Sequence, residues 1–369
     1  MKITDVRVEI VRIPLKEPKR FAAKTVYFRD YIIAHVDTDE GISGWGFCWG
    51  LPVVGKIVTD YFRDLLIGAS PFDRALLWHK MYKSMAVLDR GGISYRAISI
   101  IDIALWDIAG KAAGLPIHQL MGSYREKTPA YYSGGYNPVS CETESALFAY
   151  MEKEFSGYYD KGFRAFKMKI GALPPDVEMK RVALVRKIVG DDSQLMVDAN
   201  NSWDLITAIN MARRLEEFNV AWIEEPVAMD DLKSCAKVAA STTIPIAIGE
   251  SHFARWAFRE IIESGAGEYL QGDPTVMGGF TEWLNLAGLA ATYGMPLAPH
   301  CPHDINVQIC SARPEVTVME YFDLDSDVFT IQAVFENPVA AENGFVSSPS
   351  GAGHGLILNE EAVKRYRLE

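Results

Sequence analysis

The sequence LMVDANNSWDLITAINMARRLEEFNVAWIE, residues 195–224, contains the pattern that decides the fold. Its two ends, residues 195–198 and 221–224, are short apolar runs of the kind that form buried strands. Between them, residues 205–218 place apolar side chains every three or four positions, as an amphipathic helix does. A strand, a helix and a second strand in this order predict a parallel βαβ unit.

This alternation continues on both sides of the quoted stretch. Further short apolar runs lie at residues 130–133, 165–170, 244–250, 269–273, 296–300 and 316–320. Helical periodicity returns between several of them, for example at residues 177–189 and 280–293. Strands that recur about every 25–30 residues, with helices between them, fit a (β/α) barrel of the TIM type. We therefore expect residues 123–320 to form an α/β barrel.

The first 122 residues have a different pattern. Segments with strand character, which predict antiparallel pairing around tight turns, lie at residues 2–13, 31–36 and 44–48. Stretches with helical periodicity follow at residues 57–66, 75–85 and 93–113. Gly114-Leu115-Pro116 ends the last of these helices. We expect an α+β capping domain at residues 1–122, and we expect residues 321–369 to fold back on it.

Composition and charge argue against several classes of protein. The chain has 369 residues, 49% of them hydrophobic and 23% charged, which is typical of a globular protein with a large core. Its net charge of -11, without a block of Lys and Arg, argues against nucleic acid as a partner. The most apolar segment, residues 97–110, is interrupted by Asp102 and Asp107 and is unsuited to spanning a membrane.

The cysteines and the N-terminus bear on the compartment. The cysteines have neither CxxC spacing nor an even number, and they are Cys48, Cys141, Cys235, Cys301 and Cys310. Such a set fits reduced thiols in a cytoplasmic enzyme better than a disulfide framework. Residues 1–10 alternate like a strand and lack the apolar core of a signal peptide. We expect a cytoplasmic homo-oligomer with no membrane or nucleic-acid partner.

Nearly every predicted barrel strand ends in an ionisable side chain. In chain order these residues are Lys167, Lys169, Asp198, Glu224, Glu250, Asp273, His300 and Glu320. The carboxyl ends of parallel barrel strands meet at one face, which is where such barrels place their active sites. A charge at the end of a buried strand also needs a charged partner or a metal ion. We therefore expect these side chains to form one site.

Three carboxylates stand on successive predicted strands. Glu224 follows Asp198 by 26 residues, and Glu250 follows Glu224 by 26, which corresponds to one βα unit each. Together they concentrate negative charge that a cation would neutralise, and a ligand set made only of oxygen suits Mg²⁺. The alternative is that each acid pairs with a Lys or Arg of the barrel. Zinc is disfavoured, because it prefers His or Cys ligands.

Two groups at the same face are suited to moving protons. Lys167 and Lys169 are two positions apart on one strand and point to the same side, and mutual repulsion beside a divalent cation would lower the lysine pKa toward neutrality. Asp273 and His300 end neighbouring strands, and a carboxylate bound to one imidazole nitrogen leaves the other free for proton transfer. A zinc site at His300-Cys301-Pro302-His303 is an alternative, but it lacks a second pair of ligands.

In combination, these motifs resemble the mandelate racemase subgroup of the enolase superfamily. The matching pieces are KMK (167–169), VDAN (197–200), WIEEP (222–226), IGE (248–250), Asp273 and His300. In the first domain, AISIIDIALWD (97–107) and KAAGLP (111–116) resemble the signature of that family. The resemblance covers nearly the whole chain. It implies a modified (β/α)₇β barrel with an α+β N-terminal capping domain.

The resemblance also implies a role for each residue of the site. The ligands that it implies for Mg²⁺ are Asp198, Glu224 and Glu250, with Asn200 beside them. Lys169 would be the base on one face of the substrate, and Lys167 would neutralise the substrate carboxylate. His300, oriented by Asp273, would be the acid or base on the other face. Glu320 would form a hydrogen bond with the carboxylate as it becomes an enediolate.

The expected reaction starts with removal of the proton next to a carboxylate. Mg²⁺ and fixed hydrogen bonds would stabilise the resulting enediolate. Loss of a β-hydroxyl then gives a 2-keto-3-deoxy acid, and family members with Lys-x-Lys opposite an Asp–His dyad resemble acid-sugar dehydratases. Protonation from the far face would instead make the protein a racemase or epimerase of a 2-hydroxy acid. A non-catalytic binding barrel is the second alternative, and the complete set of acids and bases argues against it.

Substrate selection is expected in two loops of the capping domain, residues 18–29 and 49–55. The first contains Lys19, Arg20, Lys24 and Arg29, which suit a polyol or a distal carboxylate, although a solvated basic loop is the alternative. Lys24 and Asn200 are our candidates for substrate binding. An aryl substrate would need apolar residues, which residues 21–23 and 51–54 supply. The predicted strand ends lack bulky apolar residues, and this favours a sugar acid.

Overall fold

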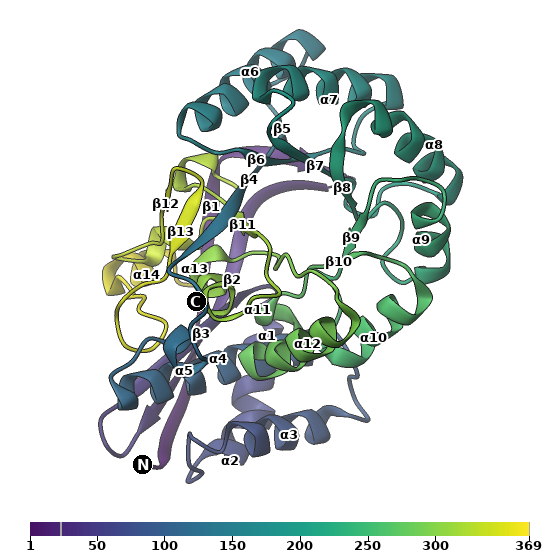
Figure 1. The fold of residues 1–369 in the computed structure, drawn as a ribbon. Coiled ribbons are helices and arrows are strands. Elements are labelled where there is room, and N and C mark those ends of the chain that lie inside the picture. The colour runs from purple at the N-terminus through teal and green to yellow at the C-terminus, as the bar shows by residue number, and fades with distance from the viewer. Residues whose placement is uncertain (23, 369) are drawn as a thin grey trace.

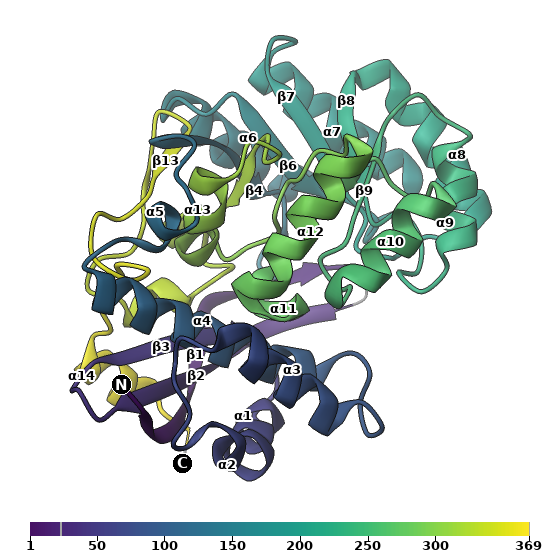
Figure 2. The same ribbon diagram turned by 60° about the horizontal axis from the view of Figure 1, so that its bottom comes forward.

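The computed structural model describes residues 1–22 and 24–368 (Figure 1). The chain forms a capping domain around an antiparallel sheet and an α/β domain around parallel strands. Helix α4 (Ile93–Ala113) lies between the capping sheet and two helices of the α/β domain (Figure 2). Within the described residues, we find no helix that is both long and apolar enough to cross a membrane.

The capping sheet is built on a long hairpin. Its strands are β1 (Ile3–Phe21), β2 (Lys24–Thr38) and β3 (Ser43–Trp49), and the short β5 (Asn137–Pro138) pairs with the end of β1. The predicted loop at residues 18–29 is wrong, since Lys19 pairs with Val26 and Phe21 with Lys24. The β-branched and aromatic residues from Thr25 to Phe28 favour a strand, which explains the difference. Ala23 lies outside the described residues.

Helices cover one face of this sheet. They are α1 (Val53–Ile57), a π-helical turn (Val58–Phe62), α2 (Arg63–Leu66), α3 (Arg74–Met85) and α4. All three helices predicted for this region are present, and the first begins at Val53 rather than at residue 57. Helix α4 ends at Gly114, whose φ of 67° is a left-handed conformation that glycine adopts without strain. Helix α4 is buried along most of its length because protein covers both sides of it.

The α/β domain follows the predicted alternation. Its parallel strands are β4 (Lys127–Gly134), β6 (Ala165–Lys169), β7 (Gln194–Asp198), β8 (Val220–Glu224), β9 (Ile246–Ile248), β10 (Tyr269–Leu270) and β11 (Met319–Tyr321). They pair in the order β10-β9-β8-β7-β6-β4, with β11 on the other side of β4. Leu297 forms single parallel bridges with Leu270 of β10 and with Val316, which lies three residues before β11.

Two predicted strands are shorter than expected for identifiable reasons. Residues 296–300 contribute only the bridges at Leu297, because Pro296 and Pro299 have no N–H group for a ladder. Strand β10 stops at Leu270, since Asp273 already caps the next helix by accepting a hydrogen bond from the Thr275 N–H.

Helices connect the strands and cover the outside of the sheet. They are α5 (Ile117–Leu120), α6 (Glu144–Asp160), α7 (Pro175–Val189), α8 (Leu205–Leu215), α9 (Leu232–Ala239), α10 (Ala254–Ser264), α11 (Pro274–Met277), α12 (Gly279–Tyr293) and α13 (His303–Ala312). The main hydrophobic core lies between these helices and the strands. A smaller apolar layer inside the strands consists of Tyr131, Met196, Trp222, Ala247, Ala298 and Val318. Because side chains alternate along a strand, residues two positions after this layer also point inside.

The C-terminal segment contacts the capping domain and contains β12 (Ala341–Glu342), β13 (Phe345–Ser347) and α14 (Glu360–Tyr366). Its contacts with the first domain include hydrogen bonds from Leu368 N to Ile10 O at 2.8 Å and from His354 N to Asp107 Oδ1 at 3.1 Å. In Figure 1 this segment, coloured yellow, lies along the purple N-terminal sheet. It brings residues 322–329 over the same end of the α/β domain as the hairpin β1–β2.

Candidate active site

Three carboxylates meet at the carboxyl ends of neighbouring strands. Asp198 and Glu224 are the last residues of β7 and β8, and Glu250 follows β9 by two residues. Each residue offers an oxygen, and these oxygens lie within 4.8 Å of one another. Glu250 Oε2 is buried and has no hydrogen-bond partner among the described residues.

Two lysines from β6 reach the same cluster. Lys167 Nζ lies 2.6 Å from Glu224 Oε1 and 2.7 Å from Glu320 Oε1. Lys169 Nζ contacts Asp198 Oδ2. Both side chains are buried and point inside the strands, as their spacing predicts.

The acidic surroundings of the two lysines set the direction of their pKa shifts. Burial lowers the pKa of Lys169, but its ionisable neighbours, Asp198 first, together raise the pKa above its usual value. Burial likewise lowers the pKa of Lys167, while its neighbours, Glu224 first, together raise it well above its usual value. These directions apply to the side chains alone, whereas the predicted fall applies beside a divalent cation and stays a prediction.

The pKa values of the two carboxylates Glu224 and Glu320 shift in opposite directions. Burial and the nearby charge of Asp198 raise the pKa of Glu224 to about 8. Burial also raises the pKa of Glu320, but Lys167, His300 and Lys169 together more than compensate and the pKa falls to about 2. Glu224 thus lies where negative charge is crowded, and a bound cation would relieve that repulsion.

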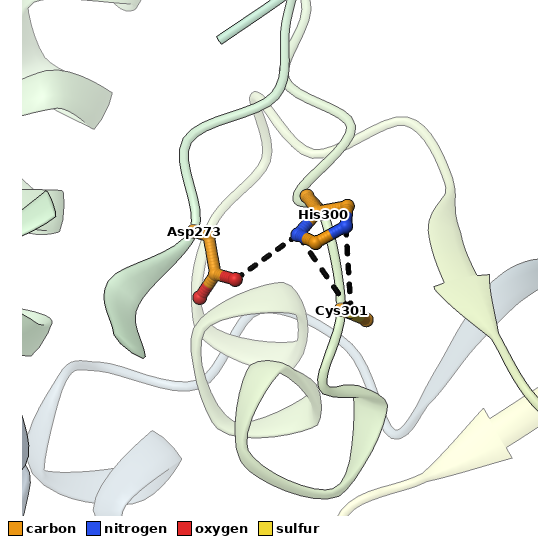
Figure 3. A group of neighbouring side chains, drawn as sticks. All are labelled: Asp273, His300 and Cys301. Atoms are coloured by element: carbon orange, nitrogen blue, oxygen red, sulfur yellow. Dashed lines mark hydrogen bonds and ion pairs between the residues drawn. The ribbon is translucent and has the colours of Figure 1, made fainter. Parts of the chain in front are cut away.

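A carboxylate–imidazole pair stands beside the cluster (Figure 3). His300 Nδ1 lies 3.0 Å from Asp273 Oδ2. The other oxygen of Asp273 accepts hydrogen bonds from Thr275 N and Thr275 Oγ1, both at 2.7 Å, which fixes the carboxylate. With Asp273 ionised, the proton of a neutral imidazole sits on Nδ1, and Nε2 is left free to accept one. His300 Nε2 is 3.4 Å from Glu250 Oε2, so the pair adjoins the carboxylates.

Burial lowers the pKa of His300, but its ionisable neighbours Cys301, Glu250 and Asp273 raise it well above the usual range. Cys301 Sγ lies 3.5 Å from His300 Nε2, and Figure 3 shows the thiol beside the ring. His303 has a different partner, since its Nε2 forms a hydrogen bond of 3.0 Å with the carbonyl oxygen of Val339. The alternative zinc motif at residues 300–303 is therefore not assembled, although Asp273, His300 and Cys301 do place ligand atoms within 4.8 Å of one another.

Glu320 and Asn200 lie at the edges of the cluster. Glu320 Oε2 accepts a hydrogen bond from Cys301 N at 3.1 Å, which holds it next to His300. Asn200 N donates to Asp198 Oδ1 at 2.8 Å, and Asn200 has a left-handed φ of 44°. Its Oδ1 is buried without a hydrogen-bond partner among the residues that the structure describes. Both residues can therefore fix a neighbour, and Asn200 also offers a free acceptor.

A cavity of about 60 Å³ opens at this cluster. Its polar lining includes Lys169, Asn200, Glu250 and His300, whereas Lys167 lies below it between carboxylates. Its cover is aromatic and apolar, and consists of Phe21, Trp49, Tyr136, Phe322, Val328 and Phe329. The expectation concerned only the predicted strand ends, and most of this cover comes from elsewhere, from the capping domain and the C-terminal segment. An apolar cover therefore surrounds a polar floor, which the strand ends alone did not predict.

The basic residues of the hairpin have different surroundings. Arg29 lines the cavity. Lys19 is buried and donates a hydrogen bond to Ser326 O, which ties the hairpin to the C-terminal segment. Lys24 is exposed and is not among the residues that line the cavity. Of the predicted substrate-binding residues, the structure brings Asn200 to the cavity but leaves Lys24 at the surface.

Both domains match models of known protein families. Residues 3–122 match the model of the mandelate racemase / muconate lactonizing enzyme N-terminal domain, and residues 150–362 match the enolase C-terminal domain-like model. The second match alone covers more than half of the chain. The chain belongs to the mandelate racemase / muconate lactonizing enzyme family. The predicted fold class, an α+β cap on an α/β barrel, is confirmed.

Relatives in this family cover the chain from end to end. The D-galactarolactone cycloisomerase of Agrobacterium fabrum is 33% identical over 383 residues, spanning 100% of this chain and 99% of that protein. The L-talarate/galactarate dehydratase of Salmonella typhimurium is 30% identical over 343 residues, 91% of this chain and 82% of that protein. A crystal structure described as a racemase from Streptomyces coelicolor with bound magnesium superimposes with a TM-score of 0.91 at 30% identity, covering 99% of this chain and 100% of that one.

Sequence reasoning missed one polar residue of the family site. Gln271 is fully buried, and its Nε2 donates to Glu224 Oε2 at 2.7 Å. Trp222 Nε1 reaches the same oxygen at 3.3 Å. The sequence contained a signal for Gln271. Side chains alternate along a strand, and Gln271 lies two positions before Asp273 in a predicted strand, so the two are expected on the same side. Gln271 orients a carboxylate of the cluster, and such supporting residues influence metal affinity strongly.

Proposed function

We propose that the protein is a Mg²⁺-dependent sugar-acid dehydratase. It would remove the proton next to the substrate carboxylate and expel the β-hydroxyl, giving a 2-keto-3-deoxy acid. One observation carries the proposal: Lys169 and His300 line a single cavity next to the carboxylates Asp198, Glu224 and Glu250. Removal of the α-proton and loss of the β-hydroxyl need one group that takes a proton and one that gives a proton, next to a site that binds the carboxylate.

The carboxylate cluster fits magnesium on its own geometry. Its donors are all oxygen, and the crowding of their charge contributes to raising the pKa of Glu224 to about 8. Glu250 Oε2 accepts no hydrogen bond from the described residues. We assign Asp198, Glu224 and Glu250 as the residues that would hold the ion. Bound there, Mg²⁺ would act as a Lewis acid for the negative charge that develops on the substrate carboxylate.

The residues of the chain would then handle the proton and the leaving group. Lys169 or His300 takes the α-proton, and the C–H electron pair becomes part of an enediolate. Lys167 holds the carboxylate end as its charge grows. Glu320, ionised at neutral pH, contacts Lys167 at 2.7 Å and would form a hydrogen bond with the substrate carboxylate only after it is protonated. The electron pair returns to expel the β-hydroxyl, which leaves as water after receiving a proton from His300 Nε2. This proton is the α-proton if His300 was the base. If Lys169 was the base, it is the proton of a His300 imidazolium, which the raised pKa of His300 favours. Asp273 keeps His300 oriented through both steps. The resulting enol converts to the 2-keto acid.

The names of the relatives support elimination chemistry and add a second candidate. The Salmonella typhimurium protein is a dehydratase of talarate and galactarate. The Agrobacterium fabrum protein, which matches over its whole length, is a cycloisomerase of a lactone. Loss of a ring oxygen instead of a hydroxyl from the β-carbon would use the same proton abstraction, so a sugar-acid lactone is the second candidate substrate. Cytoplasmic location, homo-oligomeric assembly and domain limits at residues 122 and 320 stay predictions from sequence.

A substrate panel tests the proposal. Five- and six-carbon sugar acids, their lactones and simple 2-hydroxy acids are incubated with protein and Mg²⁺, and 2-keto products are measured with semicarbazide. We expect a keto product from at least one sugar acid, dependent on Mg²⁺. A keto product from lactones alone would favour the ring-opening reaction. Inversion of a 2-hydroxy acid without any keto product would make the protein a racemase and contradict the proposal.

A further inference from the structure

A second cavity lies outside the one that Lys169 and His300 line. It has a volume of about 480 Å³ and is bounded by the end of hairpin β1–β2, the segment after β3 and the start of α4. Arg29 and Trp49 line both this outer cavity and the inner one. These two side chains therefore separate the cavities.

The inner cavity is too small to hold a sugar acid by itself. Its volume of about 60 Å³ is far below the roughly 300–1,000 Å³ of typical small-molecule sites, whereas the outer cavity has about 480 Å³. A six-carbon sugar acid has more than a dozen non-hydrogen atoms and is several times larger. If its reacting carboxylate lies next to Lys169 and His300, the far end must reach past Arg29 and Trp49 toward the outer cavity.

The outer cavity has an excess of positive charge at this junction. Arg29 makes one long hydrogen bond, from Nε to Val328 O at 3.3 Å, so most of its donors are available. Arg96 lies 4.5 Å from the centre of the Trp49 ring and donates to Trp49 O at 2.8 Å. The one acid in the lining, Asp30, is neutralised by two hydrogen bonds from Arg12, at 2.7 and 2.8 Å.

Trp49 adds a donor that lacks an acceptor. Its indole Nε1 is buried and has no hydrogen-bond partner among the described residues. A buried N–H without a partner is costly, and an oxygen of a ligand at this position would remove that cost. Two guanidinium groups and an unpaired indole N–H around one junction form a donor set that suits a carboxylate.

We propose that Arg29, Arg96 and the indole N–H of Trp49 form a subsite for the distal carboxylate of a six-carbon dicarboxylic sugar acid. This inference rests on the proposed function, because it assigns the far end of the substrate of that reaction. It makes the protein selective for diacids over monoacids of the same stereochemistry. A monoacid has a neutral hydroxymethyl group at this end and gains no charge-assisted hydrogen bond there.

The test compares matched diacids and monoacids, such as galactarate and galactonate, with Mg²⁺ present. The variants are Arg29→Gln and Arg96→Gln, and in the second the new amide group can still donate to Trp49 O. Arg63→Gln is the control, since Arg63 is an exposed arginine of the same domain that pairs with Asp5 and does not line either cavity. Both kcat/KM and the dissociation constant from calorimetry are measured, and thermal unfolding checks that each variant folds.

We expect wild type to favour diacids by about tenfold or more, and each subsite variant to lose about that factor for diacids only, while Arg63→Gln changes neither class. Equal loss for both classes, no loss, or a preference for monoacids would overturn the subsite. The dissociation constants from calorimetry distinguish failure of the subsite from failure of the proposed reaction. Tighter binding of diacids that Arg96→Gln abolishes, without any keto product, would keep the subsite and reject the elimination.

Discussion

The variant Asp273→Asn tests whether the pair formed by Asp273 and His300 transfers the substrate proton. The carbonyl oxygen of the new side chain can still accept both hydrogen bonds from Thr275, so the change keeps the anchor at this position. The amide NH₂ group then faces His300 Nδ1 in place of the carboxylate oxygen at 3.0 Å. An amide donor stabilises the imidazole with its proton on Nε2, which is the nitrogen that must accept the substrate proton.

The expected loss follows from the step that is blocked. General acid–base catalysis by a positioned group contributes roughly 10²–10⁴-fold, which corresponds to about 3–5 kcal/mol. We expect kcat on the preferred sugar acid to fall by that factor, with little change in Mg²⁺ affinity. At a pH above the pKa of His300, where the imidazole is neutral, nitrogen-15 NMR should show its proton on Nδ1 in wild type and on Nε2 in the variant.

A matched control removes a different contact to the same carboxylate. Thr275→Val deletes the hydroxyl that donates to Asp273 Oδ1 but leaves the Thr275 N–H and the His300 contact in place. We expect a loss of about tenfold or less, because one neutral donor to a charged acceptor is removed. Near wild-type turnover in Asp273→Asn, with the tautomer changed, would refute the role of His300 in proton transfer.

Further predictions concern the metal and the interdomain contact. Mg²⁺ at 100 times its dissociation constant should raise the free energy of unfolding by about 2.7 kcal/mol in thermal melts, and the same shift in Asp198→Asn would contradict the assigned ligands. Gln271→Leu should weaken Mg²⁺ binding by about tenfold or more in calorimetry, because Glu224 loses its donor at 2.7 Å, and unchanged affinity would remove Gln271 from the site. Burial raises the pKa of Asp102 to about 7, whereas its pKa in the unfolded chain is about 3.9. The protonated form therefore stabilises the fold below about pH 4, and this stabilisation is lost as the pH rises to about 7. Asp102→Asn keeps an acceptor for Thr281 N and cannot ionise, so wild type should lose melting temperature relative to this variant between about pH 4 and 7, and parallel curves would contradict the shift.

Local rules predicted the placement of the polar cluster well. Period-two alternation places Asp198, Glu224 and Glu320 on the inner side of their strands, two positions after the apolar layer that contains Met196, Trp222 and Val318. The same rule places Lys167 and Lys169 on one side. Each of these inferences needs only a strand's direction and its end, which short apolar runs indicate.

Features that depend on contacts between distant segments were not predictable in this way. The aromatic cover joins Phe21 with Phe322 and Phe329, which are about three hundred positions away in the chain. The sequence made Lys19 a candidate for substrate binding, but in the structure it donates a hydrogen bond to the carbonyl oxygen of Ser326 in the C-terminal segment. The carboxylates that each lysine ammonium group contacts were not predictable either, because spacing in the sequence does not show them.

The most direct test of the central claim follows the hydrogen next to the substrate carboxylate by proton NMR in D₂O. The account predicts that wild type removes this hydrogen from an accepted sugar acid only when Mg²⁺ is present. It also predicts a 2-keto product with one deuterium on the neighbouring carbon. The double variant Lys169→Ala, His300→Asn should bind Mg²⁺ and leave the signal unchanged. Loss of the signal in that variant, or its persistence in wild type with Mg²⁺ and every acid of the panel, would contradict proton abstraction by this pair.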